Sequence, residues 1–259
     1  MRLTFLGTGT SFGVPQVGCG CAVCHSADPR DRRGRSGALL EADGASLLLD
    51  SPPELRLHLL RQGVSRLDAV LYTHEHADHT AGIDDLRIFT VRQRRHLPIY
   101  GPPETLEKLA SNYRYIFDPE VTAFEGTSKP HLDPRPLEAG VPAVVAGIPV
   151  LPLAFPHGHL RVYGYRFGRL AYLTDVKAVG PAERAALAGV EVLVVNALWW
   201  RSHPTHLSID EAVTVAGELG AARTYLTHLT HETGHAELAA RLPAGVTPAY
   251  DGLTVEVPG

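Results

Sequence analysis

Short apolar segments recur along the chain, and glycine or proline follows many of them. This pattern is typical of buried strands that are joined by turns. Strands are therefore predicted at Arg2–Leu6, Ser46–Asp50, Ala69–Thr73, Leu97–Tyr100, Ile148–Leu153, Val162–Phe167, Leu170–Thr174, Val190–Val195, Thr224–Thr227 and Leu253–Val257.

Three further segments carry the spacing or the end signals of helices. Pro103–Tyr115 has apolar residues at helical spacing, and Pro181–Leu187 begins with a proline that suits a first helical turn. Ser208–Leu219 begins with a serine, and Glu211 follows three residues later, as in a capping box. The stretch Glu120–Ala146 is rich in proline and glycine and is predicted to be loop. Strands interspersed with helices indicate an α/β sandwich.

Composition then narrows the class of protein. The chain has 259 residues, with 24 Lys and Arg against 28 Asp and Glu, and a net charge of −4. Its apolar fraction of 44% is that of a globular protein, and the acidic balance excludes a basic nucleic-acid module. No apolar stretch is long enough to span a bilayer. We interpret residues 1–259 as a single domain without a membrane partner. We expect it in the cytoplasm, because no signal peptide is visible at its start.

The sequence Tyr-Thr-His-Glu-His-Ala-Asp-His, which begins in the third predicted strand, carries the strongest chemical signal. His74, His76, Asp78 and His79 lie within six residues of one another. A strand directs His74 and His76 to one side, whereas a turn after them directs Asp78 and His79 at a second point. Imidazole together with carboxylate suits zinc, iron or manganese. The pattern therefore predicts two neighbouring metal ions.

His-x-His-x-Asp-His after an apolar strand resembles the signature of the metallo-β-lactamase fold hydrolases. The resemblance extends from Gly7 to about Asp251 and implies a four-layer αββα sandwich. It also implies further single ligands, each of which follows a later strand. The sequence supplies such residues in order, as His157, Asp175 and His228.

The resemblance implies two divalent ions, manganese or zinc, in the active site. It assigns His74, His76 and His157 to one ion, Asp78, His79 and His228 to the other, and Asp175 to both. Asp78 also counts among the predicted catalytic residues, and Asp50, at the end of a strand, matches a supporting acidic residue. His159 is an alternative to His157, which is favoured because it comes first after its strand.

The three cysteines form a second candidate metal site. Cys19, Cys21 and Cys24 have the spacing Cys-x-Cys-x-x-Cys. The chain has only these three cysteines, and a small odd number of cysteines argues against a disulfide framework. Three thiolates need a fourth ligand to complete tetrahedral zinc. A subgroup that resembles the phosphoribosyl 1,2-cyclic phosphate phosphodiesterases carries this motif, with a histidine three residues after the last catalytic-site histidine. His231 stands there, and His25 is the competing ligand for this structural zinc.

The resemblance also implies a mechanism. Two metal ions that share a water lower its pKa and supply a hydroxide that attacks a phosphoryl group. His206, just before the third predicted helix, matches the family position of the general acid, and His203 is the competing choice. The glycine-rich turn Gly7–Thr10 is expected to line the metal cleft. Trp199 and Trp200 are expected in the core or the cleft wall.

We therefore expect a phosphodiesterase whose substrate is a small cyclic or linear phosphodiester. A tRNA 3′-processing endonuclease is the alternative. A net charge of −4 and the lack of a long basic insertion make a nucleic-acid substrate less favoured than a small phosphodiester. A thioester or β-lactam hydrolase fits the zinc motif and His206 poorly. A non-catalytic relative would keep the zinc motif alone and bind a single zinc. Family relatives are often dimers, so a homodimer stays open.

Overall fold

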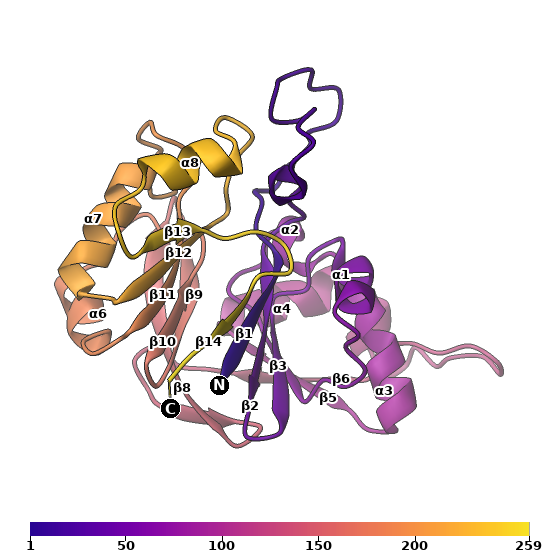
Figure 1. Cartoon of the computed structure of the whole chain (residues 1–259). Coiled ribbons are helices and arrows are strands. Elements are labelled where there is room, and N and C mark those ends of the chain that lie inside the picture. The colour runs from indigo at the N-terminus through magenta and orange to yellow at the C-terminus, as the bar shows by residue number, and fades with distance from the viewer. Residues whose placement is uncertain (259) are drawn as a thin grey trace.

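Two seven-stranded sheets face each other in the computed structural model, which describes residues 1–258 (Figure 1). Helices α1, α3 and α4 lie outside the first sheet, and α6, α7 and α8 lie outside the second (Figure 1). The layers therefore run helix, sheet, sheet, helix. This arrangement confirms the predicted four-layer αββα sandwich.

The first sheet has the strand order β14-β1-β2-β3-β4-β5-β6. Its strands are β1 (Arg2–Gly7), β2 (Gly37–Ala42), β3 (Ala45–Leu49), β4 (Ala69–Leu71), β5 (Leu97–Gly101), β6 (Leu132–Pro136) and β14 (Thr254–Glu256). The helices of this half are α1 (Leu55–Arg61), α2 (Ala77–Thr80), α3 (Arg87–Gln93), α4 (Pro103–Asn112) and α5 (Arg114–Phe117), with short 3₁₀ turns at Pro29–Asp31 and Ile83–Leu86. Pairing is antiparallel from β14 to β3 and parallel from β3 to β6.

The second sheet has the order β13-β12-β11-β10-β9-β8-β7. Its strands are β7 (Ala143–Val145), β8 (Ile148–His157), β9 (Leu160–Phe167), β10 (Leu170–Leu173), β11 (Val192–Asn196), β12 (Arg223–Thr227) and β13 (Val246–Pro248), and its helices are α6 (Pro181–Ala186), α7 (Ile209–Leu219) and α8 (His235–Arg241). Pairing is antiparallel from β7 to β10 and parallel from β10 to β13. None of the helices in residues 1–258 has the length and apolar character needed to cross a membrane.

The inner faces of the sheets share one apolar core. Leu3 and Phe5 of β1 belong to the same buried cluster as Tyr165, Phe167 and Val194 of the second sheet. Successive strand residues point to opposite faces, so residues two apart, such as Leu3 and Phe5, enter the core together. Burial of each such large side chain contributes about 1.5–3 kcal/mol, which holds the two sheets together.

The predicted capping box at the start of α7 is confirmed. The Ser208 hydroxyl accepts the Glu211 amide hydrogen at 3.2 Å, and the Ser208 amide donates to the Glu211 carboxylate at 2.7 Å. The helix ends at Gly220, whose φ of 66° is left-handed and therefore suits glycine.

The prediction that Glu120–Ala146 is loop is wrong in two places, because β6 and β7 lie within this stretch. β6 contains two prolines and lies at the edge of its sheet, where a residue without an amide hydrogen is tolerated. β7 is only three residues long, and it is defined by its pairing with β8. Both strands depend on a neighbour that the local sequence does not reveal.

Candidate metal centre

Three predicted site residues lie at strand ends, and each has an unusual backbone conformation. Asp50 follows β3 with φ 61°, Asp175 follows β10 with φ 60°, and His228 follows β12 with φ 57°. A left-handed conformation at a residue other than glycine costs of the order of 1–3 kcal/mol and persists where surrounding contacts enforce it. Backbone hydrogen bonds supply such contacts: the Asp50 amide donates to the Leu71 carbonyl at 3.0 Å, and the Leu229 amide donates to the Thr8 carbonyl at 2.9 Å.

His74, His76 and His157 form one group of possible ligands. Their nitrogens lie within 4.8 Å of one another, and His74 Nε2 is 3.0 Å from His76 Nδ1. Two imidazole nitrogens at that distance need a proton or a cation between them. His157 Nδ1 lies 3.0 Å from the Thr205 carbonyl oxygen, so Nε2 is the nitrogen available to a metal ion.

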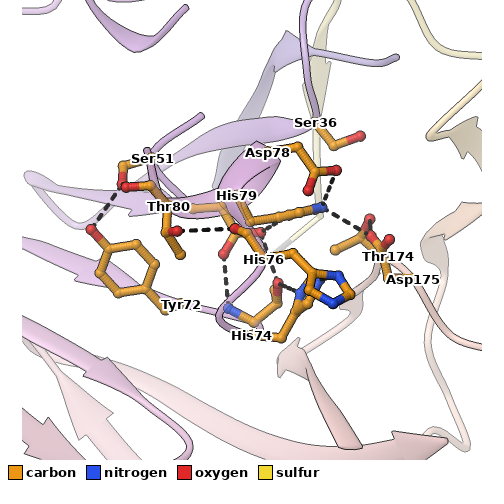
Figure 2. A network of polar contacts seen from close by, with 12 residues as sticks. Ser36, Ser51, Tyr72, His74, His76, Asp78, His79, Thr80, Thr174 and Asp175 are labelled. Atoms are coloured by element: carbon orange, nitrogen blue, oxygen red, sulfur yellow. Dashed lines mark hydrogen bonds and ion pairs between the residues drawn. The ribbon is translucent and has the colours of Figure 1, made fainter. Parts of the chain in front are cut away.

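Asp78, His79 and His228 form a second group within the same distance. His79 Nε2 lies 3.4 Å from an Asp78 oxygen and 3.3 Å from an Asp175 oxygen (Figure 2). Within residues 1–258, His79 Nε2 and both ring nitrogens of His228 are buried and form no hydrogen bond, although carboxylate oxygens lie 3.1–3.4 Å from the two Nε2 atoms. Buried polar atoms without a partner cost about 1–3 kcal/mol each. These atoms therefore fit a bound cation.

Asp175 contacts both groups. One carboxylate oxygen lies 3.1 Å from His228 Nε2 and 2.9 Å from His206 Nε2, while the other lies 3.3 Å from His79 Nε2. Asp175 also forms a group of possible ligands with His74 and His79. Burial raises the pKa of Asp175, but the imidazoles of His228 and His79 outweigh burial and hold the pKa well below its usual range.

Asp50 supports the centre through His79. One Asp50 oxygen accepts the Thr73 amide hydrogen at 2.8 Å, and the other accepts the Thr73 hydroxyl at 2.9 Å and lies 2.8 Å from His79 Nδ1. A carboxylate on one ring nitrogen fixes the tautomer and aims the other nitrogen at a metal ion. The sequence analysis did not predict a role for Thr73 at this site, although a polar residue between an apolar strand and His74 would have pointed to it.

The alternatives that the sequence leaves open near His157 and His206 lie in different surroundings. His157 is buried within the first group, whereas His159 is exposed and belongs to none of the possible ligand groups in residues 1–258. His206 Nε2 faces Asp175, whereas His203 lies behind His206, with 3.2 Å between their Nδ1 atoms. The Thr205 hydroxyl lies within 3.1 Å of both rings.

The cysteine site is assembled from two distant segments. The sulfurs of Cys19, Cys21 and Cys24 lie 3.3, 3.3 and 3.4 Å from His231 Nδ1. Tetrahedral zinc with ordinary bond lengths separates a sulfur and a nitrogen ligand by roughly 3.6 Å, so the four donors fit this ion. The Cys24 amide donates to the Cys21 sulfur and lowers the pKa of Cys21 to about 6. His25 is exposed, and its Nδ1 faces the Cys21 carbonyl oxygen at 3.2 Å.

The glycine-rich turn at the start of the chain joins the two sites. The Thr10 amide donates to the Leu229 carbonyl, and the Thr8 carbonyl accepts the Leu229 amide hydrogen. A Cβ at Gly7 would lie 1.9 Å from the Arg35 carbonyl oxygen, so only glycine permits this close approach. The predicted position of the turn beside the metal cleft agrees with these contacts.

Comparison with known proteins shows the family. A family model described as a Beta-lactamase superfamily domain matches residues 45–229. The chain belongs to this superfamily. The predicted metallo-β-lactamase fold and the predicted class, a metal-dependent hydrolase, are thereby confirmed, and the relatives below are consistent with both.

Three relatives indicate which members of the superfamily the chain is similar to. A crystal structure of a new diphosphatase from the PhnP family has a TM-score of 0.91 and 37% identity, and the match covers 99% of this chain and 98% of that one. Ribonuclease Z from Methanopyrus kandleri is 31% identical over 93% of this chain and 96% of its own length. An octanoyltransferase from Porphyromonas gingivalis is 39% identical over 98% of this chain. The chain spans about half (51%) of that relative's length.

Proposed function

We propose that the chain is a dinuclear-metal-dependent phosphodiesterase that cleaves a small cyclic or linear phosphodiester. The observation that carries the proposal is the position of Asp175, whose carboxylate contacts both groups of ligands and His206. Two divalent ions, when bound, supply a water of lowered pKa and offset the negative charge of a phosphoryl group. Phosphodiesters suit such a centre because their anionic oxygens bind metal ions.

In this proposal each group of candidate ligands would hold a different metal ion. His74, His76 and His157 would hold one ion, Asp78, His79 and His228 the other, and Asp175 both, with manganese or zinc as the metal. Asp78 has a catalytic role in this proposal because its carboxylate faces the reacting centre. Cys19, Cys21, Cys24 and His231 would hold one structural zinc. Reduced thiols at that site favour the cytoplasm.

His206 would protonate the leaving oxygen. Its Nε2 faces the centre at 2.9 Å from Asp175, and its Nδ1 lies 2.8 Å from the Thr205 hydroxyl. These two contacts fix the ring plane and hold Nε2 at the centre. With Asp175 engaged by the metal ions, a proton on Nε2 would be available to an oxygen displaced from phosphorus. His203 contacts only the far side of this ring, and its role in the proposal is to position His206.

A tRNA 3′-processing endonuclease is the second candidate, because the match to ribonuclease Z covers nearly the whole of both chains. An arm that binds tRNA would need basic residues. The segment 118–131 does project from the body of the molecule (Figure 1), but Asp118, Glu120 and Glu125 outnumber Lys129. The charge of this segment therefore favours a small substrate.

Metal-dependent hydrolysis tests the proposal. After chelation and dialysis, the protein receives manganese or zinc and is assayed on bis(p-nitrophenyl) phosphate, a cyclic ribose phosphate, a diphosphate ester and a tRNA precursor. We expect cleavage of the small diesters, and we expect Asp175→Ala to reduce it by at least about 100-fold because a ligand of both ions is lost. Asp210→Ala, at the exposed start of α7, is the matched control.

Other outcomes assign the chain differently. Cleavage of the tRNA precursor alone would support the endonuclease, and cleavage of the diphosphate ester alone would place the chain with the PhnP-family diphosphatase. A single tightly bound zinc without any activity would indicate a non-catalytic relative. His206→Ala should slow cleavage by about 10²–10⁴-fold on a diester with a poor leaving group, and near-native turnover there would exclude His206 as the acid.

A further inference from the structure

A cavity of about 190 Å³ adjoins the metal centre. It shares His206 and His228 with the centre, and Phe12, Leu198 and Trp199 contribute apolar surface to its walls. A cavity of about 150 Å³ accommodates a benzene-sized molecule, so this one has room for a single planar ring system. Since it borders the residue that would protonate the leaving oxygen, a group bonded to that oxygen could lie in it.

Two aromatic side chains, Phe12 and Trp199, form part of the cavity wall. Phe12 is 71% exposed although it lies next to a buried polar centre. Trp199 is held in place by the Arg201 guanidinium, 4.3 Å from its ring centroid, and by the edge of His203 at 5.2 Å. Rigid rings beside a site bind planar groups at a low entropic cost.

Two residues that line the cavity also carry buried polar atoms without partners. Thr10 is only 3% exposed, and its hydroxyl has no hydrogen-bond partner in the described part of the chain. The buried Trp199 Nε1 likewise has none among residues 1–258. Buried groups of this kind are costly unless a ligand satisfies them. A rotation of either side chain would present its hydroxyl or indole N–H to the polar edge of a heterocyclic ring, and a few such groups orient ligands in apolar sites.

The charged side chains around this cavity offer little to a second phosphate. No lysine or arginine lines it anywhere in residues 1–258, and its one carboxylate is that of Glu232. Glu232 is engaged by Arg201 at 2.6 Å. The histidines of the lining belong to the two candidate metal sites or, like His203, contact Thr205 and His206. The remaining walls are mainly apolar and suit an uncharged ring better than an anion.

We propose that this cavity binds the uncharged planar part of the leaving group, a nucleobase or another aromatic ring attached to the leaving alcohol. The inference rests on the proposed phosphodiesterase function, because it places the leaving oxygen beside His206. It makes the substrate class more specific: a diester whose leaving alcohol is a nucleoside or an aryl-bearing alcohol. The ring of a nucleoside comes either from a small nucleotide ester or from the end of an RNA chain.

Binding of the free leaving alcohol tests this without turnover. The metal-loaded protein is titrated with adenosine by calorimetry, and inorganic phosphate is titrated separately as a probe of the metal centre. We expect one adenosine per chain. Phe12→Ala and Trp199→Ala should each raise its Kd about tenfold, because stacking of one base is lost. Trp199→Phe should recover most of the affinity, and phosphate binding should not change.

The matched control is Phe124→Ala, which removes another largely exposed phenyl group, 84% against 71% for Phe12, from the projecting segment 118–131. Adenosine binding that is absent from the native protein, or that is unchanged in both Phe12→Ala and Trp199→Ala, would overturn the inference. Phe12 lies on an exposed loop, so its variant remains informative if Trp199→Ala fails to fold.

Two substrates separate this inference from the proposed function. A dinucleotide and its analogue without the base on the leaving nucleoside share the same leaving oxygen. We expect kcat/KM to be about tenfold higher for the base-bearing substrate, and we expect this preference to disappear in Phe12→Ala. Equal cleavage of both substrates would leave the phosphodiesterase intact and remove the subsite. Adenosine binding without any hydrolysis would support the subsite and contradict the proposed phosphodiesterase function. A tRNA precursor that displaces adenosine when the dinucleotide does not would identify RNA as the source of the ring.

Discussion

Asp50 directs the imidazole of His79 without belonging to either group of ligands. Its two oxygens are fully used by Thr73 and His79, and both Asp50 and His79 are completely buried. Burial raises the pKa of Asp50, although His79 opposes that effect. The carboxylate therefore acts on the centre through a single ring, and its removal changes the orientation of one ligand rather than the number of ligands.

Asp50→Asn tests this role. An amide in place of the carboxylate weakens the contact with His79 Nδ1, so we expect metal affinity and kcat/KM to fall by about 10–100-fold while the fold is retained. Metal titration and circular dichroism measure the two effects. Asp43→Asn is the matched control, because Asp43 is exposed and also has a positive φ. Native metal affinity in Asp50→Asn would contradict the assigned role.

Among the elements of the fold, the N-terminal loop depends most on a local link. Between β1 and β2 the described chain contains one short 3₁₀ turn, Pro29–Asp31. Cys19, Cys21 and Cys24 in this loop lie against His231, which comes three residues after the ligand candidate His228. Zinc bound there would connect the loop to the segment after β12, because a metal site contributes its binding energy to the folded state.

Cys24→Ser tests this link. We expect one zinc fewer per chain and a Tm about 5–10 °C lower, since loss of a metal ligand costs several kcal/mol and each kcal/mol shifts Tm by about 2–4 °C at this size. Metal analysis and calorimetry provide the measurement. His25→Gln should leave both values unchanged, because His25 is exposed and its ring faces a carbonyl oxygen. A lower zinc content in His25→Gln, with His231→Gln unaffected, would transfer the fourth position to His25.

Across the whole molecule, the two sheets bury their inner faces in one shared core. The chain ends meet as well, because the Met1 amino group donates to the Val257 carbonyl at 3.0 Å and β14 pairs with β1. We therefore propose that residues 1–259 act as a single domain and unfold together. Stability of such a unit reflects every buried titratable group, wherever it lies.

Acid should destabilise the molecule between pH 6.5 and 4 through two buried histidines. Burial lowers the pKa of His58 to about 4 and that of His235 to about 4, whereas burial raises the pKa of Asp251 to about 6. The two imidazoles bind a proton less readily in the folded chain than in the unfolded one, so stability falls as pH drops from 6.5 to 4. Asp251 has the opposite effect, because it is protonated more readily when folded, and it offsets part of the loss.

His58→Gln isolates one of these contributions. The folded pKa of about 4 corresponds to about 1–2 kcal/mol of stability lost at pH 5 for this one residue, since its ordinary value is 6.5. We expect the decrease in unfolding free energy between pH 7 and pH 5 to shrink by this amount in the variant. Urea unfolding at both pH values measures it, with the exposed His96→Gln as control. An undiminished decrease in His58→Gln would show that His58 does not titrate in this range.

The sequence alone predicts metal binding wherever the candidate ligands are close together along the chain. The residues His74 to His79 and the three cysteines have spacings that indicate metal binding on their own. Apolar runs ended by glycine or proline located most of the strands, and a serine with a glutamate three residues later located the start of α7. Each of these features depends on a few neighbouring residues, so it can be predicted without knowledge of the tertiary structure.

Only the tertiary structure shows which distant residues lie beside these donors. His231 and Cys19 are 212 positions apart, and His157 is distinguished from His159 by burial, which depends on packing between segments. The edge strands β6 and β7 exist through pairing with neighbours. The cavity between Phe12 and Trp199 likewise requires two segments that meet only in the folded chain. Periodicity determines which face of an element is buried, whereas contacts between elements determine where that face lies.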